Sequence, residues 1–183
     1  MTTALQKTEK IRAVFLETQL FYAKHDEMPA LIAYLSDTEK EFSSIAYESA
    51  SMAIALKSFE AETFPHEWLL FASGPAAAHH AQVYVGLGWA IAKFNFPFLT
   101  AVIKLDSKFY FRIADGCGYY DGSFKHRRTV TNKELPVYLP DAAMPMYYQG
   151  VGRSIWYTAK ADIHHICSKI ESFAAERHAD LWR

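Results

Sequence analysis

The chain has 183 residues, of which 51% are hydrophobic and 15% aromatic. This composition is enough for one domain with a packed core, and it excludes an intrinsically disordered chain. With 19 basic and 20 acidic residues the formal net charge is −1, so the charge balance gives no general attraction for nucleic acid or for an anionic membrane.

The N-terminal stretch MTTALQKTEKIRAVF carries charges where a secretory signal would need an apolar run. The two cysteines, Cys117 and Cys167, lie far apart in the sequence, which argues against a disulfide framework. Both features indicate a cytoplasmic protein in a reducing setting.

Three helices are predicted in the first third of the chain. Apolar residues recur at helical intervals over residues 4–24. Pro29 suits the first turn of a short helix that runs through Leu35. Residues 39–58 predict a longer helix in which small residues stand among apolar ones, and Phe64-Pro65 ends it.

The middle of the chain is apolar. HEWLLFA (66–72) begins another helix, residues 77–94 form the clearest helix by length, and residues 99–111 fit either a helix or a strand. The apolar stretch 81–103 is long enough to raise the question of a membrane span. Its interruption by Lys93, Asn95 and Pro97 predicts buried segments and no span, because charged residues are costly at the middle of a bilayer.

The last third combines turn residues with two further helices. ADGCGYYDG (114–122) has the composition of a turn, and three prolines at 136, 140 and 145 mark an irregular connection. We therefore expect an irregular Gly/Pro-rich segment around 111–145. Residues 146–158 and 161–174 predict two helices, and a short segment closes the chain.

Pairs of small residues separated by one position recur along the chain. Their first members are 37, 30 and 34 residues apart, close to the length of a helix–turn–helix repeat. The sequence thus predicts a single all-α domain, 1–183, with helical-repeat-like packing of helix pairs. The pairs are Ser49/Ser51, Gly86/Gly88, Gly116/Gly118 and Gly150/Gly152.

The glycine pairs could cradle a phosphate or let two helices approach closely. A dinucleotide loop needs a preceding strand and a third glycine, but Ile155 stands at that position after Gly150 and Gly152. A glycine inside a helix costs roughly 1 kcal/mol relative to alanine, so the pairs need compensation. We expect neighbouring backbones to approach closely at the glycines, with large rings such as Trp89 and Trp156 packed around the space left by the missing side chains.

The histidines and cysteines give a weak metal signal. His79-His80 could supply a ligand or a proton-transfer group, or could simply open a helix. His164 and His165 point about 100° apart on a helix, so both cannot readily hold one ion, and Cys167 fits an ordinary buried position. We expect no bound metal and no cofactor.

Charged residues near the glycines are further candidates. Asp115 and Asp121 could act as an acid/base pair or could hold backbone N–H groups in turns. KHRR (125–128) could grip a phosphate or carboxylate, for example on a carrier-protein-bound substrate, or form a solvated face. Arg153 lies in an apolar, aromatic segment and needs a buried partner, for which Asp115 and Asp121 are the candidates.

The ordered motifs resemble a domain of unknown function found in proteins encoded beside enediyne polyketide synthases. The resemblance covers residues 45–182 and leaves residues 1–44 poorly matched. The motifs are AYESASMAIAL (46–56), LLFASGPAAAHHAQVYVGLGWAIAKF (69–94), ADGCGYYDGSFKHRR (114–128), YYQGVGRSIWY (147–157) and AAERHADLW (174–182). By position, the resemblance carries over the polar residues Glu48, His79, Asp115, Arg127, Arg128, Gln149, Arg153 and Asp180.

The resemblance implies an accessory role in polyketide-derived metabolism but no reaction. Members of that family continue past ADLW into another glycine-rich helix, whereas this sequence ends at Arg183. The neighbour that would cover the last helix is then either absent or supplied by another chain, for example in a homodimer.

Three functional hypotheses remain open. In the first, the protein binds an apolar polyketide or polyene intermediate through Trp89, Phe111, Tyr119, Arg127, Arg128, Gln149 and Trp156. In the second, it is an enzyme acting on such an intermediate, with His79, Asp115 and Arg153 as acid/base and charge-stabilising groups. In the third, it is a helical-repeat adaptor that binds a protein partner.

Overall fold

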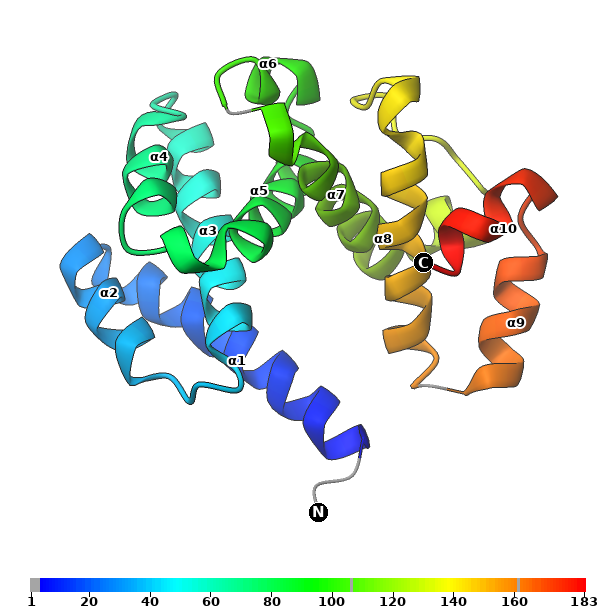
Figure 1. Ribbon diagram of the computed structural model, residues 1–183, viewed down its shortest axis with the longest axis horizontal. Helices are drawn as coiled ribbons and strands as arrows, with labels where there is room; N and C mark the ends of the chain where they lie inside the picture. The colour runs from blue at the N-terminus through cyan, green and yellow to red at the C-terminus, as the bar shows by residue number, and fades with distance from the viewer. Residues whose placement is uncertain (1–3, 106, 161) are drawn as a thin grey trace.

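The computed structural model describes residues 4–105, 107–160 and 162–183, and within these ranges every regular element is a helix (Figure 1). The all-α prediction is confirmed. The long helices are α1 (Ala4–His25), α3 (Ser43–Glu60), α5 (His80–Phe94), α7 (Tyr110–Phe124) and α8 (Met144–Thr158). The shorter ones are α2 (Met28–Asp37), α4 (His66–Ser73), α6 (Phe98–Val102), α9 (Ile163–Glu171) and α10 (Ala175–Leu181).

Long and short elements alternate along the chain. Figure 1 shows the long helices fanned through the middle of an arch, with α2, α4, α6 and α9 along its outer side. Each long helix packs against the next, in the order α1, α3, α5, α7, α8, and α8 then packs against α10. After α7 the outer position is taken by a short π-helical turn, Arg127–Thr131, and an irregular segment.

The long helices α3, α5 and α7 run in the same general direction. His79, just before α5, stacks on Tyr47 near the start of α3, and Phe59 near the end of α3 meets Phe94 at the end of α5. Likewise Lys125, just after α7, reaches the carbonyl of Ala92 near the end of α5. Parallel neighbours joined by a returning short element are the arrangement of helical-repeat proteins, as the sequence spacing predicted.

The glycine pairs form the crossings between these helices. A methyl group on Gly86, Gly116 or Gly150 would lie closer than 3.0 Å to a carbonyl oxygen of the preceding long helix. That carbonyl belongs each time to the residue just before the preceding pair, namely Glu48, Val85 and Asp115. The first glycine of each pair therefore faces backward along the array.

The second glycine of each pair faces the following helix. Methyl groups on Gly88 and Gly118 would overlap the carbonyl oxygens of Ile113 and Tyr147, each three residues before the next pair. Gly152 meets the carbonyl of Leu181 in α10 in the same way. The repeat thus consists of backbone contacts at equivalent positions of successive helices. Carbonyl oxygens occupy the space beside the glycines, where aromatic rings were expected.

Serines play the same part in α3. The Ser49 hydroxyl donates to the carbonyl oxygen of Phe15 in α1 at 2.5 Å, and the Ser51 hydroxyl donates to that of Val83 in α5 at 2.6 Å. Val83 again lies three residues before the next pair. A serine side chain with its own hydrogen bond therefore replaces the direct backbone contact made at the glycine positions.

One predicted segment differs from the structure. Residues 111–124 are helical, with Gly116, Gly118 and Gly122 buried inside α7, so the irregular connection is confined mainly to residues 132–140. Glycine and aspartate favour turns locally, but the crossings with α5 and α8 require a helix without side chains at these positions, and tertiary packing overrides the local preference. Within the described part of the chain, no helix is both long and apolar enough to cross a membrane.

Candidate functional site

The crossing of α7 and α8 brings together an acidic and a basic side chain. Gly150 packs against the carbonyl of Asp115, so the two backbones nearly touch. Arg153, three residues further along α8, donates from Nε and Nη2 to the two Asp115 oxygens at 3.2 and 2.9 Å. The Asp115 side chain is 5% exposed and that of Arg153 is 37% exposed. The predicted buried partner of Arg153 is therefore Asp115.

Four aromatic rings, one from each of four helices, line up beside this ion pair. Ring centres lie 4.5 Å apart for Phe15 and Trp89, 4.9 Å for Trp89 and Tyr119, and 5.8 Å for Tyr119 and Tyr157. The Arg153 guanidinium lies 5.0 Å from the centre of the Tyr119 ring, within cation–π range. We call Phe15, Trp89, Tyr119 and Tyr157 the ring row.

A second carboxyl group, that of Glu48 in α3, is buried near the ion pair. Burial raises the pKa of Glu48 to about 7; the charge of Arg153 opposes this rise, that of Asp115 adds to it, and the Trp89 N–H lowers it. The Trp89 Nε1 is itself buried, and the Glu48 carboxyl is the acceptor that it approaches. Glu48, Trp89, Asp115, Tyr119 and Arg153 together form what we call the central cluster.

The raised pKa of Glu48 predicts a pH-dependent stability. The ordinary value is 4.5, so the stabilising contribution of Glu48 is complete below pH 4.5 and is lost as pH rises through about 7. Between pH 4.5 and 8, wild type should therefore lose roughly 3 kcal/mol of its free energy of unfolding through Glu48, and the Glu48→Gln variant should not show this loss. Urea unfolding across this range measures the difference, with the exposed Glu60→Gln as control. Parallel curves for wild type and Glu48→Gln would contradict the assignment.

His79 lies away from the ion pair. Its Nδ1 is 3.3 Å from the Ser44 hydroxyl, its ring stacks on Tyr47 at 4.2 Å, and burial lowers its pKa. It precedes Trp89 by ten residues, about 15 Å along a helix. The structure thus brings together two of the three predicted acid/base and charge-stabilising groups, and places the third against α3. Sequence reasoning assigned Glu48 no role beyond its match in the family motif.

The remaining predicted ligand-binding residues are dispersed. Phe111 and Trp156 are exposed, by 36% and 47%, and Gln149 is half-buried one turn before Arg153. Arg127 is exposed, whereas Arg128 donates from Nε to Glu134 at 2.9 Å. Only Trp89 and Tyr119 of that set belong to the central cluster.

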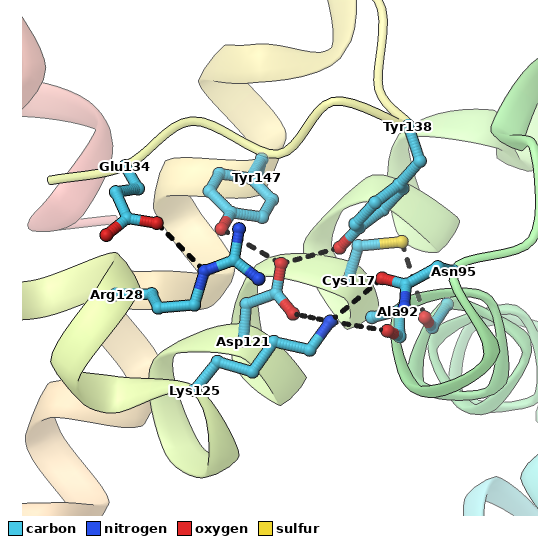
Figure 2. A network of polar contacts seen from close by, with 10 residues as sticks. Ala92, Asn95, Cys117, Asp121, Lys125, Arg128, Glu134, Tyr138 and Tyr147 are labelled. Atoms are coloured by element: carbon cyan, nitrogen blue, oxygen red, sulfur yellow. Dashed lines mark hydrogen bonds and ion pairs between the residues drawn. The ribbon is translucent and has the colours of Figure 1, made fainter.

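Asp121 anchors a separate polar network (Figure 2). Its Oδ2 accepts hydrogen bonds from Tyr138 at 2.6 Å and Tyr147 at 3.1 Å, and its Oδ1 pairs with Lys125 at 3.0 Å. Lys125 also donates to the Ala92 carbonyl and to Asn95. A cavity of about 220 Å³ adjoins these groups. Because its buried charges are paired, we interpret the network as a clasp that holds the segment 132–140 against α5, α7 and α8.

An open groove lies between α1 and α3. It measures about 550 Å³, and its walls include the exposed Leu16 and Leu20 together with Ala53 and Leu56. Gln19 also lines the groove and donates to the Met52 sulfur at 3.1 Å. Because Phe15 lies one helical turn before Gln19, the groove begins next to the ring row.

No group of three or more His, Cys, Asp or Glu side chains among the described residues is arranged to hold a metal ion. His164 and His165 are exposed, and their backbone N–H groups donate to the Asp162 side chain that caps α9. Cys117 is buried and donates to the Gly88 carbonyl at 3.3 Å. These residues serve local structure.

The sequence model of a family described as "Protein of unknown function (DUF1702)" matches residues 1–183. The match includes residues 1–44, which the motif comparison had left poorly matched. No curated protein and no solved structure matches the chain.

Proposed function

Since the chain belongs to the DUF1702 family of proteins of unknown function, we propose its function from the geometry of its own site. It is a helical-repeat protein that binds an extended apolar molecule along the ring row and the α1–α3 groove. The observation that carries this proposal is the open groove between α1 and α3, whose walls are mainly apolar. The ring row lies near it, because Phe15 and the groove residue Gln19 are one helical turn apart on α1.

The ligand class follows from the shape and chemistry of these surfaces. Phe15, Trp89 and Tyr119 pack on one another with their planes tilted by 30–33°, and Tyr157 meets Tyr119 edge-on. The half-buried rings of Phe15, Tyr119 and Tyr157 leave part of this polarisable surface for contact with a conjugated chain. The groove volume of about 550 Å³ is within the range of small-molecule sites. The motif resemblance to proteins encoded beside enediyne polyketide synthases supports a polyketide or polyene intermediate, and hence an accessory role in such a pathway.

An enzyme is the second candidate, and Glu48 is the observation that favours it. A buried carboxyl with a pKa of about 7 can donate or accept a proton near neutrality, and it lies beside the Asp115–Arg153 pair. In that case Glu48, rather than His79, would be the acid/base group.

A protein-binding adaptor is the third candidate. The groove is open to solvent, and Leu16 and Leu20, exposed by 47% and 70%, lie one turn apart on α1. This spacing would also accept the apolar face of a partner helix.

The binding proposal can be tested with diphenylhexatriene, a hydrocarbon polyene that fluoresces in apolar surroundings. Leu20→Arg places a charge in the groove and should weaken binding about tenfold or more. Leu70→Arg alters another strongly exposed leucine, 61% exposed on α4, and should leave binding unchanged. Absence of binding to wild type, or equal binding by both variants, would contradict the proposal.

A further inference from the structure

The groove between α1 and α3 differs in character at its two ends. One end lies near Phe15, where the Ser49 hydroxyl meets the Phe15 carbonyl. At the other end the Lys57 ammonium pairs with Asp26 at 2.7 Å. Asp26 follows Phe15 by eleven residues, about 16 Å along a helix. An extended molecule that lies on the apolar walls therefore reaches charged side chains at the end remote from Phe15.

Three charged side chains line that remote end of the groove, namely Asp26, Lys57 and Glu60. Lys57 is paired with Asp26, whereas Glu60 is exposed and makes no ion pair with another described residue. Glu67 lies close behind them, because it accepts a hydrogen bond at 3.3 Å from Tyr22, which also lines the groove. The hydrogen bond to Asp26 and the charge of Glu67 raise the pKa of Lys57. Three carboxyl groups thus stand against one ammonium group.

This balance of charges decides which end group of a ligand the groove accepts. An ammonium group can lie between Glu60 and Asp26 while the pair of Asp26 and Lys57 stays intact. A carboxylate would have to displace Asp26 from Lys57 and would then lie near Glu60, where like charges repel. Because these side chains are open to solvent, the resulting preference is moderate and depends on salt.

We infer that the groove binds the ammonium group of a long-chain amine at the end formed by Asp26 and Glu60, with the hydrocarbon chain directed toward Phe15. The inference rests on the proposed function, because the same groove holds the apolar part of the ligand. It narrows the ligand class to a chain that carries a basic nitrogen at one end. Glu60, as the carboxylate without an ion pair, sets this specificity.

Three ligands with one hydrocarbon chain test the inference: dodecylamine, dodecanol and dodecanoic acid, which differ in end-group charge at pH 7. Each is titrated, below the concentration at which it forms micelles, into protein loaded with diphenylhexatriene, and the loss of fluorescence reports displacement. Wild type should bind dodecylamine about two- to fivefold more tightly than dodecanol, and should bind dodecanoic acid more weakly than dodecanol. Salt at about 0.5 M should remove most of both differences.

A charge-reversal variant assigns the preference to Glu60. Glu60→Lys should bind dodecanoic acid more tightly than dodecylamine, the opposite of the wild-type order. The readout is the ratio of two affinities, so a general loss of binding in the variant does not affect it. Glu171→Lys makes the same change at an exposed glutamate that ends α9, and should keep the wild-type order.

Each outcome decides a separate point. If neither diphenylhexatriene nor dodecanol binds wild type, the proposed function itself is wrong and the inference falls with it. If wild type binds dodecylamine no more tightly than dodecanol, or Glu60→Lys keeps the preference for the amine, the inference is wrong and the proposed function stands. Tighter binding of dodecanoic acid than of dodecylamine by wild type would overturn the assignment of a cationic end group.

Discussion

Gly150→Ala should destabilise the protein by about 3 kcal/mol or more, although alanine is the better helix former. The added methyl group would overlap the carbonyl oxygen of Asp115, and the backbone of α7 cannot move without disturbing its crossing with α5. Helix propensity alone predicts the opposite sign, a gain of roughly 1 kcal/mol. Urea unfolding followed by circular dichroism measures the change.

The matched control for this substitution is Ala33→Gly, at an exposed position of α2. It reports helix propensity without a crossing and should lower stability by about 1 kcal/mol. A Gly150→Ala variant as stable as wild type would show that α7 and α8 do not touch through their backbones.

Arg153→Met should cost about 3 kcal/mol, because it leaves the Asp115 carboxylate buried without its partner. The loss should be larger at pH 8 than at pH 5, since the unpaired carboxyl has a raised pKa and becomes protonated as pH falls. Asp115→Asn in the Arg153→Met background removes the orphaned charge and should restore most of the lost stability.

A double-mutant cycle over wild type, the two single variants and the double variant gives the coupling energy between Asp115 and Arg153. We expect the double variant to be clearly more stable than the sum of the single losses implies. Strict additivity would mean that the two side chains do not depend on one another in the folded protein.

The recurrence of small residues was the most informative feature of the sequence. It predicted the all-α class and the repeat because the helices cross through close backbone approach, which requires a small residue at every crossing. Glycine allows direct contact, whereas Ser49 and Ser51 in α3 reach the neighbouring carbonyls through their hydroxyls.

The same feature misled the prediction for α7. Gly116, Gly118 and Asp121 favour a turn when read locally, and the helix forms because α5 and α8 press against both faces of this segment. The local turn preference of these residues does not reveal the packing on both faces. Comparison with the other pairs does, because Gly86/Gly88 and Gly150/Gly152 have the same spacing and were predicted to lie in helices.

The site was predictable only in part. The apolar surroundings of Arg153 indicated that it needs a buried partner, and the sequence offered two aspartates as candidates. Asp115 proved to be the partner, whereas Asp121 belongs to the clasp. Glu48 could not be singled out, because its burial depends on α5 crossing directly over it at Gly86. The position of His79 likewise depends on the register between α3 and α5.

The contact register of the long helices can be measured directly by NMR on the unmodified protein. The account predicts strong Hα–Hα cross-peaks between Gly88 and Gly116, and between Gly118 and Tyr147, since the Cα atoms of Gly116 and Tyr147 border the empty Cβ positions of Gly88 and Gly118. Absence of both cross-peaks in a spectrum that shows the expected contacts within α5, α7 and α8 would contradict it.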